Sequence, residues 1–153
     1  MKRTLLAAAA AIILVQPAFA QRANYEQMVA SHAAANGVPA ELVHRVIMRE
    51  SRYRPGAVGR GGAMGMMQIK LATARGMGYT GTAEGLRDPN TNLTYAVKYL
   101  AGAYRAANGN SDRAVSYYAG GYYYAAKRQR ALNANAEISP HRSYRRHRHH
   151  RHY

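Results

Sequence analysis

The chain has 153 residues, enough for one domain with little left for a second. It contains no cysteine, which excludes disulfide bonds, thiolate zinc sites and cysteine nucleophiles. Lysine and arginine number 22 against 7 acidic residues, and the resulting formal net charge of +15 favours anionic partners. Hydrophobic residues make up 48% of the chain, which is enough for a core and argues against a wholly disordered chain.

The first 20 residues have the pattern of a secretory signal peptide. Lys2 and Arg3 precede an apolar run of 11 residues from Leu5 to Val15, and Ala18-Phe19-Ala20 supplies the small residues required for cleavage. The apolar run is too short for a membrane anchor, which needs about 20 residues. We therefore expect a mature chain that begins at Gln21 and lies in the periplasm or elsewhere in the cell envelope.

The segment after the signal peptide has the periodicity of helices. Apolar side chains recur at helical spacing from Asn24 to Asn36, and Gly37 ends that helix. Pro39 opens a second helix, which ends before Pro55 because the residue preceding a proline disfavours helix. The glycine-rich stretch from Gly56 to Gly65 is predicted to be a loop whose backbone can approach a ligand closely.

Further helices are predicted after this loop, and no stretch alternates as a strand would, apart from weak hints from Gly76 to Thr82. The pattern indicates an all-α or nearly all-α domain from residue 21 to 136. The predicted helices run from Met66 to Arg75, from the Asp88-Pro89 cap to about Gly109, from the Ser111 cap to Ala119, and from about Tyr122 to Ala134.

Residues 137 to 153 form a basic tail. From residue 141 onward the tail contains five arginines, five histidines and no acidic residue, so it repels itself and is expected to be disordered. It is either a solvated tail or an arm that adheres to anionic envelope polymers or lipids; we expect no specific nucleic-acid partner. The histidines lack a regular ligand spacing, so no metal site is predicted.

One carboxylate continues an apolar helical stripe. Glu50 lies at helical spacing from Val43, Val46 and Ile47, at the carboxyl end of its predicted helix. Desolvation and the negative end of the helix dipole would both raise the pKa of Glu50, which would let it donate a proton near neutral pH. The alternative is an ion pair with a neighbouring arginine at a frayed helix end, and this pattern alone favours neither.

Four segments in the chain occur in a characteristic order. They read ESRYRP from Glu50, GAMGMMQI from Gly62, DPNTNL from Asp88 and AVSYYAG from Ala114. These resemble the E-S-x-[aromatic]-x-P, G-x-x-G-x-M-Q-[IL], D-P-x-x-N-[IL] and A-Y-N-A-G segments of the soluble, goose-lysozyme-like lytic transglycosylases (glycoside hydrolase family 23). The resemblance covers about residues 25 to 128, and the 18-residue separation of Glu50 and Gln68 is typical of the family.

The resemblance implies a compact, lysozyme-like helical fold with a glycan-binding groove. It implies cleavage of the β-1,4 bond between N-acetylmuramic acid and N-acetylglucosamine in peptidoglycan, by a monomer that needs no cofactor. Glu50 matches the single catalytic residue, which protonates the glycosidic oxygen and then acts as base on the C6 hydroxyl, giving a 1,6-anhydro product. The alternatives are a lysozyme-type hydrolase, a non-catalytic basic wall-binding protein on the same fold, and an exported polybasic binder of nucleic acid or membranes.

The resemblance also implies a set of substrate-binding residues. Gln68 matches a substrate-contacting glutamine, Tyr117 matches a tyrosine that lies over the acid, and Ser51 matches the serine of the first motif. Met67 and Tyr118 complete the predicted set, although for Met66 and Met67 a position in the core is favoured over one in the site. Asn92 is expected to pin a backbone turn. Tyr122, Tyr123 and Tyr124 are candidates for sugar platforms in the groove, with at least one of them expected in the core.

The chain departs from the family pattern at three places. Tyr118 stands where the family has asparagine, Gly59 stands where many members have serine, and Lys70-Leu71 replaces a common methionine-proline pair. None of these residues is the acid itself. The departures therefore bear on sugar contacts and glycan preference more than on the type of reaction.

We predict that export removes the first 20 residues. N-terminal sequencing of protein recovered from the cell envelope should begin at Gln21, because Ala18 and Ala20 place small side chains where the peptidase requires them. Protein that keeps Met1 and stays in the cytosol would contradict both the cleavage and the expected location.

Overall fold

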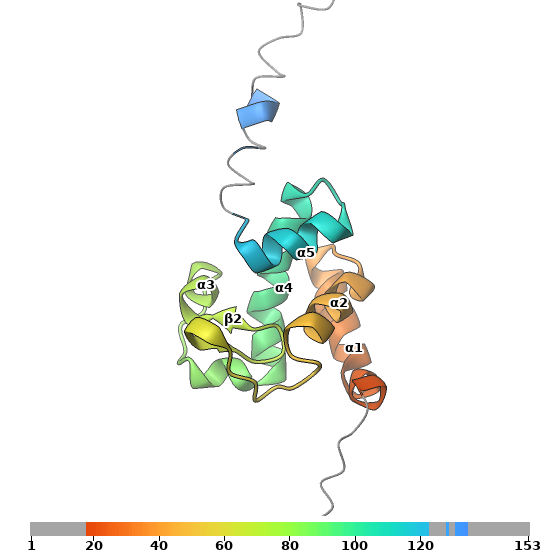
Figure 1. The fold of residues 1–153 in the computed structure, drawn as a ribbon, viewed down its shortest axis with the longest axis vertical. Coiled ribbons are helices and arrows are strands. Elements are labelled where there is room, and N and C mark those ends of the chain that lie inside the picture. The colour runs from red at the N-terminus through yellow and green to blue at the C-terminus, as the bar shows by residue number, and fades with distance from the viewer. Residues whose placement is uncertain (1–17, 123–127, 129–130, 135–153) are drawn as a thin grey trace, which may run out of the picture.

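A computed structural model describes residues 18 to 122, 128 and 131 to 134 (Figure 1). The described part is mostly helical, which confirms the predicted fold class. In chain order the elements are α1 (Ala18–Asn36), α2 (Ala40–Glu50), the 3-10 helix η1 (Arg60–Gly62), β1 (Ala63–Met64), β2 (Ile69–Lys70), α3 (Leu71–Gly76), the 3-10 helix η2 (Glu84–Arg87), α4 (Pro89–Ala106) and α5 (Ser111–Gly120).

Several predicted segments fall wholly or partly outside these residues. The apolar run of the signal peptide, the basic tail of residues 137 to 153 and most of the predicted helix from Tyr122 to Ala134 are among them. Within the described ranges, no helix combines the length and the apolar character that a membrane span requires.

Helix α4 stands at the centre of the fold. In Figure 1 it runs between the α1 and α2 helices on one side and α3 with strand β2 on the other, and it also packs against α5. Its side chains at Leu93, Ala96, Val97 and Leu100 are completely buried, at the three- and four-residue spacing of one helix face. Burying a leucine or valine of this kind contributes about 1.5–3 kcal/mol each. The start of α4 is capped as predicted: Asp88 accepts a hydrogen bond from the Thr91 amide at 2.7 Å.

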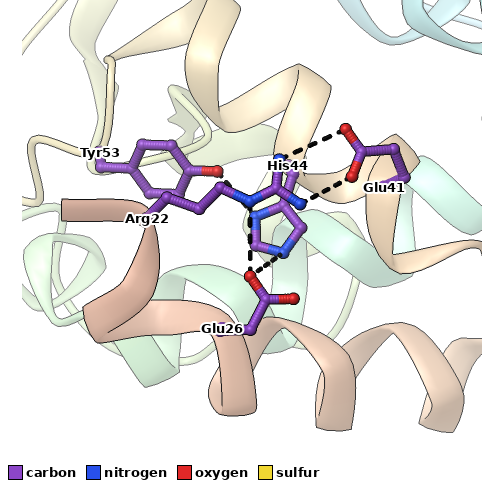
Figure 2. Close-up of polar contacts among 5 residues, drawn as sticks. All are labelled: Arg22, Glu26, Glu41, His44 and Tyr53. Atoms are coloured by element: carbon purple, nitrogen blue, oxygen red, sulfur yellow. Dashed lines mark hydrogen bonds and ion pairs between the residues drawn. The ribbon is translucent and has the colours of Figure 1, made fainter. Parts of the chain in front are cut away.

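A polar cluster of five residues joins α1 to α2 and to the turn that follows α2 (Figure 2). Arg22 on α1 lies 2.7 Å from Glu41 on α2 and 3.4 Å from Glu26. The buried ring of His44 bridges the two helices, with Nε2 3.2 Å from the Glu26 carboxylate and Nδ1 2.7 Å from the Tyr53 hydroxyl. The cluster therefore fixes the amino-terminal half of α2 relative to α1 and, through Tyr53, ties the turn after α2 to the same contacts.

The turn after α2 is held in a costly backbone conformation. Arg52 and Tyr53 have φ angles of 54° and 60°, in the left-handed region that costs roughly 1–2 kcal/mol for each residue other than glycine. Burial of the Tyr53 ring, which is 2% exposed and stacked on Tyr25 with centroids 6.3 Å apart, offsets this cost. The amides of Ser51 and Arg52 both donate to the carbonyl of Ile47, so the helix ends with its last backbone groups satisfied.

The predicted helix from Met66 to Arg75 is wrong in its first half. The chain instead turns between Gly65 and Gln68, where both residues have positive φ angles of 74° and 51°, and helix α3 begins only at Leu71. Strands β1 and β2 flank this turn and pair antiparallel, Ala63 with Lys70 and Met64 with Ile69. The strands missed by sequence analysis thus lie here, and the segment from Gly76 to Thr82 contains none.

Asn92 explains why the segment forms a turn. Its completely buried side chain accepts a hydrogen bond from the Met67 amide at 2.9 Å, and its Nδ2 donates to the carbonyls of Met64 (2.9 Å) and Leu86 (2.8 Å). A Cβ atom at Gly65 would collide with the Asn92 side chain, so the close approach requires glycine. The prediction that Asn92 pins a backbone turn is confirmed.

The cap of helix α5 differs from the prediction by one residue. Asn110, and not Ser111, accepts the capping hydrogen bond, from the Arg113 amide at 2.8 Å. Ser111 is instead the first residue of the helix. Asn and Ser are about equally good caps, so the sequence does not separate them.

We predict that Asn92→Ala destabilises the fold by about 3–5 kcal/mol, because it leaves one amide and two carbonyls buried without partners. Chemical denaturation measures this loss. Asn90→Ala is the matched control: Asn90 lies on the same helix, but its side chain is exposed and forms a hydrogen bond with His32 at 2.8 Å, so the loss should stay below about 1 kcal/mol. Equal losses for the two variants would contradict the role given to Asn92.

Candidate active site

Glu50 lines a pocket of about 270 Å³. The pocket lies where the end of α2 meets strand β2 and the first turn of α3, and Tyr99 in the middle of α4 and the end of α5 close it on the other side. Most of the side chains that line it can form hydrogen bonds, as a sugar-binding surface requires. These side chains are Gln68, Lys70, Thr73, Tyr99 and Tyr118, and the backbone of residues 119 to 121 completes the wall.

The Glu50 carboxyl group is half-buried, and burial raises its pKa. The charge of Arg49 acts in the opposite direction and is the smaller of the two effects. The raised pKa agrees with the apolar stripe on which the sequence places Glu50. Within the described residues Glu50 forms no ion pair. Arg54, one of the neighbouring arginines, instead donates a side-chain hydrogen bond to the Ser51 carbonyl at 2.9 Å. The alternative of an ion pair between Glu50 and a neighbouring arginine therefore finds no support here.

Tyr118 lines the pocket close to Glu50. Its ring is buried, and its hydroxyl donates to the Met67 carbonyl at 2.8 Å. Burial raises the pKa of the Tyr118 hydroxyl well above its usual range, and the nearby charge of Glu50 raises it further. Tyr117, which the family pattern places over the acid, packs half-buried against the core and does not line this pocket. Neighbouring side chains on a helix point about 100° apart, so the two tyrosines leave α5 in different directions.

Gln68 lines the pocket as predicted but is also tied to the surrounding loop. Its Nε2 donates to the carbonyls of Ala57 at 3.1 Å and Gly65 at 2.9 Å. A Cβ atom at Gly59 would collide with the Oε1 atom of Gln68. The glycine that replaces the family's serine therefore leaves room for the amide of Gln68.

Ser51 and Met67, which are also predicted substrate-binding residues, are not among the residues that line this pocket. Ser51 is 2% exposed, and its Oγ accepts a hydrogen bond from the Arg54 amide at 3.2 Å, which stabilises the turn after α2. Met67 is completely buried and contributes only backbone groups, its amide to Asn92 and its carbonyl to Tyr118. Both residues hold the walls of the pocket in place.

Sequence analysis missed Tyr99 and Thr73 as pocket residues. The Tyr99 ring packs against Tyr118 with centroids 5.3 Å apart, and against Tyr122 at 4.8 Å. The helical periodicity of α4 could have placed Tyr99 beside the predicted core residues Ala96 and Leu100, at the edge of the buried face. Of the three tyrosines predicted as sugar platforms, Tyr122 packs on Tyr99 outside the pocket lining, and the other two lie outside the described residues.

Among residues 18 to 122, 128 and 131 to 134, no group of three or more histidine or acidic side chains is arranged to hold a metal ion.

Comparison with known proteins identifies the family. Residues 27 to 139 match the family model of the Transglycosylase SLT domain, and the chain therefore belongs to this family, whose enzymes are lytic transglycosylases. Over 94 residues the chain is 33% identical to the peptidoglycan transglycosylase gp16 of Escherichia phage T7. That alignment covers 60% of this chain but only 7% of the phage protein, so the chain spans a small part of that relative's length. The resemblance seen in the sequence motifs is confirmed.

We predict that Glu50→Gln stabilises the protein at neutral pH relative to the wild type. A carboxyl group whose pKa is raised on folding stabilises the fold below its ordinary value of 4.5, and this contribution is lost as the pH rises through the folded pKa. The difference in Tm between Glu50→Gln and wild type should therefore be near zero in acid and grow, by a small amount, toward neutral pH. Thermal unfolding across a pH series measures it, and a difference that shrinks with rising pH would contradict the burial of Glu50.

Proposed function

We propose that this SLT domain protein is an exported peptidoglycan lytic transglycosylase that cleaves the bond between N-acetylmuramic acid and N-acetylglucosamine and leaves a 1,6-anhydromuramic acid end. The observation that carries the proposal is a lone half-buried carboxyl group, Glu50, in a polar pocket of a size suited to a sugar ring. Family membership supports the reaction class.

In the first half of the proposed reaction Glu50 is the acid. Because burial raises its pKa, a larger fraction of the carboxyl group is protonated near neutral pH than for an exposed glutamate. The proton passes to the glycosidic oxygen as the bond from C1 of the muramic sugar to that oxygen breaks. The leaving sugar departs with a free hydroxyl group, and Glu50 is left as a carboxylate.

In the second half the substrate supplies the nucleophile. Glu50 is the only carboxylate among the described side chains that line the pocket, so the second carboxylate with which most glycosidases activate water or form a glycosyl-enzyme is missing from this lining. The C6 hydroxyl of the muramic sugar attacks C1 of the same ring, and its proximity replaces the positioning of a separate nucleophile. The Glu50 carboxylate takes the C6 proton and so returns to its acid form.

The walls of the pocket supply sugar contacts. Tyrosine rings give flat faces on which sugar C–H groups can pack, and Tyr118 and Tyr99 present such rings beside Glu50. Gln68 adds an amide whose orientation is fixed by its hydrogen bonds to the loop. We infer that these three residues orient the muramic sugar toward the acid.

Export is the part of the proposal that rests on the sequence alone. Cleavage before Gln21 would remove less than one turn from α1, which begins at Ala18, and would keep the Arg22 contacts to α2. The net positive charge and the basic tail of residues 137 to 153 favour retention on anionic envelope material, an attraction that salt would weaken.

We predict that Glu50→Gln lowers the rate of glycan cleavage by at least about a hundredfold, because the amide cannot donate the proton. Release of soluble fragments from purified cell wall measures the rate, and wall binding by the variant should persist. Glu84→Gln is the matched control: Glu84 is exposed, pairs with Arg87 at 2.6 Å and lies outside the pocket, so its loss should leave the rate unchanged.

Mass spectrometry of the wild-type digest tests the route. The anhydro product is lighter than the reducing sugar by one water molecule. A digest dominated by reducing ends would instead mean a lysozyme-type hydrolase. Binding to the wall without any cleavage would mean that the protein is a wall-binding module.

A further inference from the structure

Lys70 lines the same pocket as Glu50. It is the last residue of strand β2, and its position is set by the pairing of Lys70 with Ala63 in the two-stranded sheet. The chain has lysine here where the family commonly has methionine. The lysine therefore adds a charge at a position where that common methionine would have none.

Lys70 does not form an ion pair with Glu50. Glu50 and Lys70 are the two ionisable groups of opposite sign in the described lining, yet no ion pair forms between them. The cation that acts on the pKa of Glu50 is Arg49. Lys70 therefore brings a positive charge to the edge of the pocket, where the end of its side chain lies beside Gly61.

The glycine-rich loop leaves the lysine ammonium group open to a ligand. A Cβ atom built on Gly61 would lie 3.3 Å from Nζ and 3.4 Å from Cε of Lys70, so the end of the side chain passes close to this loop. Gly61 and Gly62 carry no side chain that could bind the ammonium group. Within the described residues Lys70 forms no hydrogen bond or ion pair through its side chain, so its three donors are available.

We propose that Lys70 selects glycan strands by binding a carboxylate of the peptide stem carried by the sugar in the Glu50 pocket. The proposal rests on the proposed function, because it assumes that peptidoglycan occupies the pocket. Peptidoglycan strands carry peptide carboxylates, and an ammonium group binds a carboxylate through a charge-assisted hydrogen bond. A methionine at this position would contact the same part of the substrate without any preference for its charge.

The test compares strands that differ only in the peptide stem. Three substrates are used: strands with free stem carboxylates, the same strands with these carboxylates amidated, and strands without stems. For the wild type we expect kcat/KM to be about fivefold higher with free than with amidated carboxylates, as for a solvent-accessible ion pair, and we expect added salt to reduce this ratio. In Lys70→Met and Lys70→Gln the ratio should fall to about one, and in Lys70→Arg it should persist.

Lys98→Met is the matched control. It removes the same charge from helix α4, where Lys98 donates to the Met77 carbonyl at 2.9 Å and does not line the pocket. The wild-type ratio should survive in this variant. A ratio that persists in both Lys70→Met and Lys70→Gln, or one that falls equally in Lys98→Met, overturns the proposal.

Binding separates failure of this proposal from failure of the proposed function. Calorimetry measures the affinity of wild type and Lys70→Met for the same three substrates, whether or not they are cleaved. An absence of cleavage combined with a Lys70-dependent preference for free carboxylates would reject the reaction and support the role of Lys70. Cleavage without such a preference would support the reaction and reject the role of Lys70.

Discussion

Burial of a carboxyl group costs free energy unless the group is paired or stays protonated, and Glu50 is half-buried without an ion pair among the described residues. The surrounding structure therefore has to keep the Glu50 carboxyl group, at the end of α2, partly shielded from solvent. Tyr118 and Tyr99 cover one side of the pocket and the loop around Gln68 covers another. Both walls depend on Met67, whose carbonyl binds Tyr118 and whose amide binds Asn92.

The end of α2 is fixed from behind by groups that take no part in the pocket. Tyr53 follows Glu50 closely and occupies a left-handed conformation that only its buried contacts with His44 and Tyr25 can sustain. His44 in turn lies against Glu26 on α1 (Figure 2). The strained turn is thus balanced by packing between α1 and α2, and the position of Glu50 follows from both.

Local patterns predicted much of this arrangement from the sequence, because the forces involved act within one helix. The buried face of α2 and the Asp88 cap of α4 are of this kind. The turn at Gly65 to Gln68 is different, because the two adjacent methionines are as compatible with a buried helix as with a buried turn. The turn is decided by Asn92, 25 residues from Met67 in the chain. The choice between Tyr117 and Tyr118 likewise depends on the rotation of α5 against α2, which spacing along the chain does not specify.

The departures from the family pattern lie in or near the pocket, and Glu50 itself matches the pattern. Gly59 gives room to the Gln68 amide, Tyr118 puts a buried ring where the family has an asparagine, and Lys70 adds a charge to the wall. Each change alters what the walls can contact, whereas the burial of Glu50 depends on the turn after α2 and on the Met67 backbone. The Met67 backbone supports both the Tyr118 wall and the turn held by Asn92, so a change of a wall side chain that keeps these hydrogen bonds leaves the support of Glu50 in place. On the proposed function, the three departures therefore change the groups available for sugar contacts and keep the proposed proton donor, Glu50.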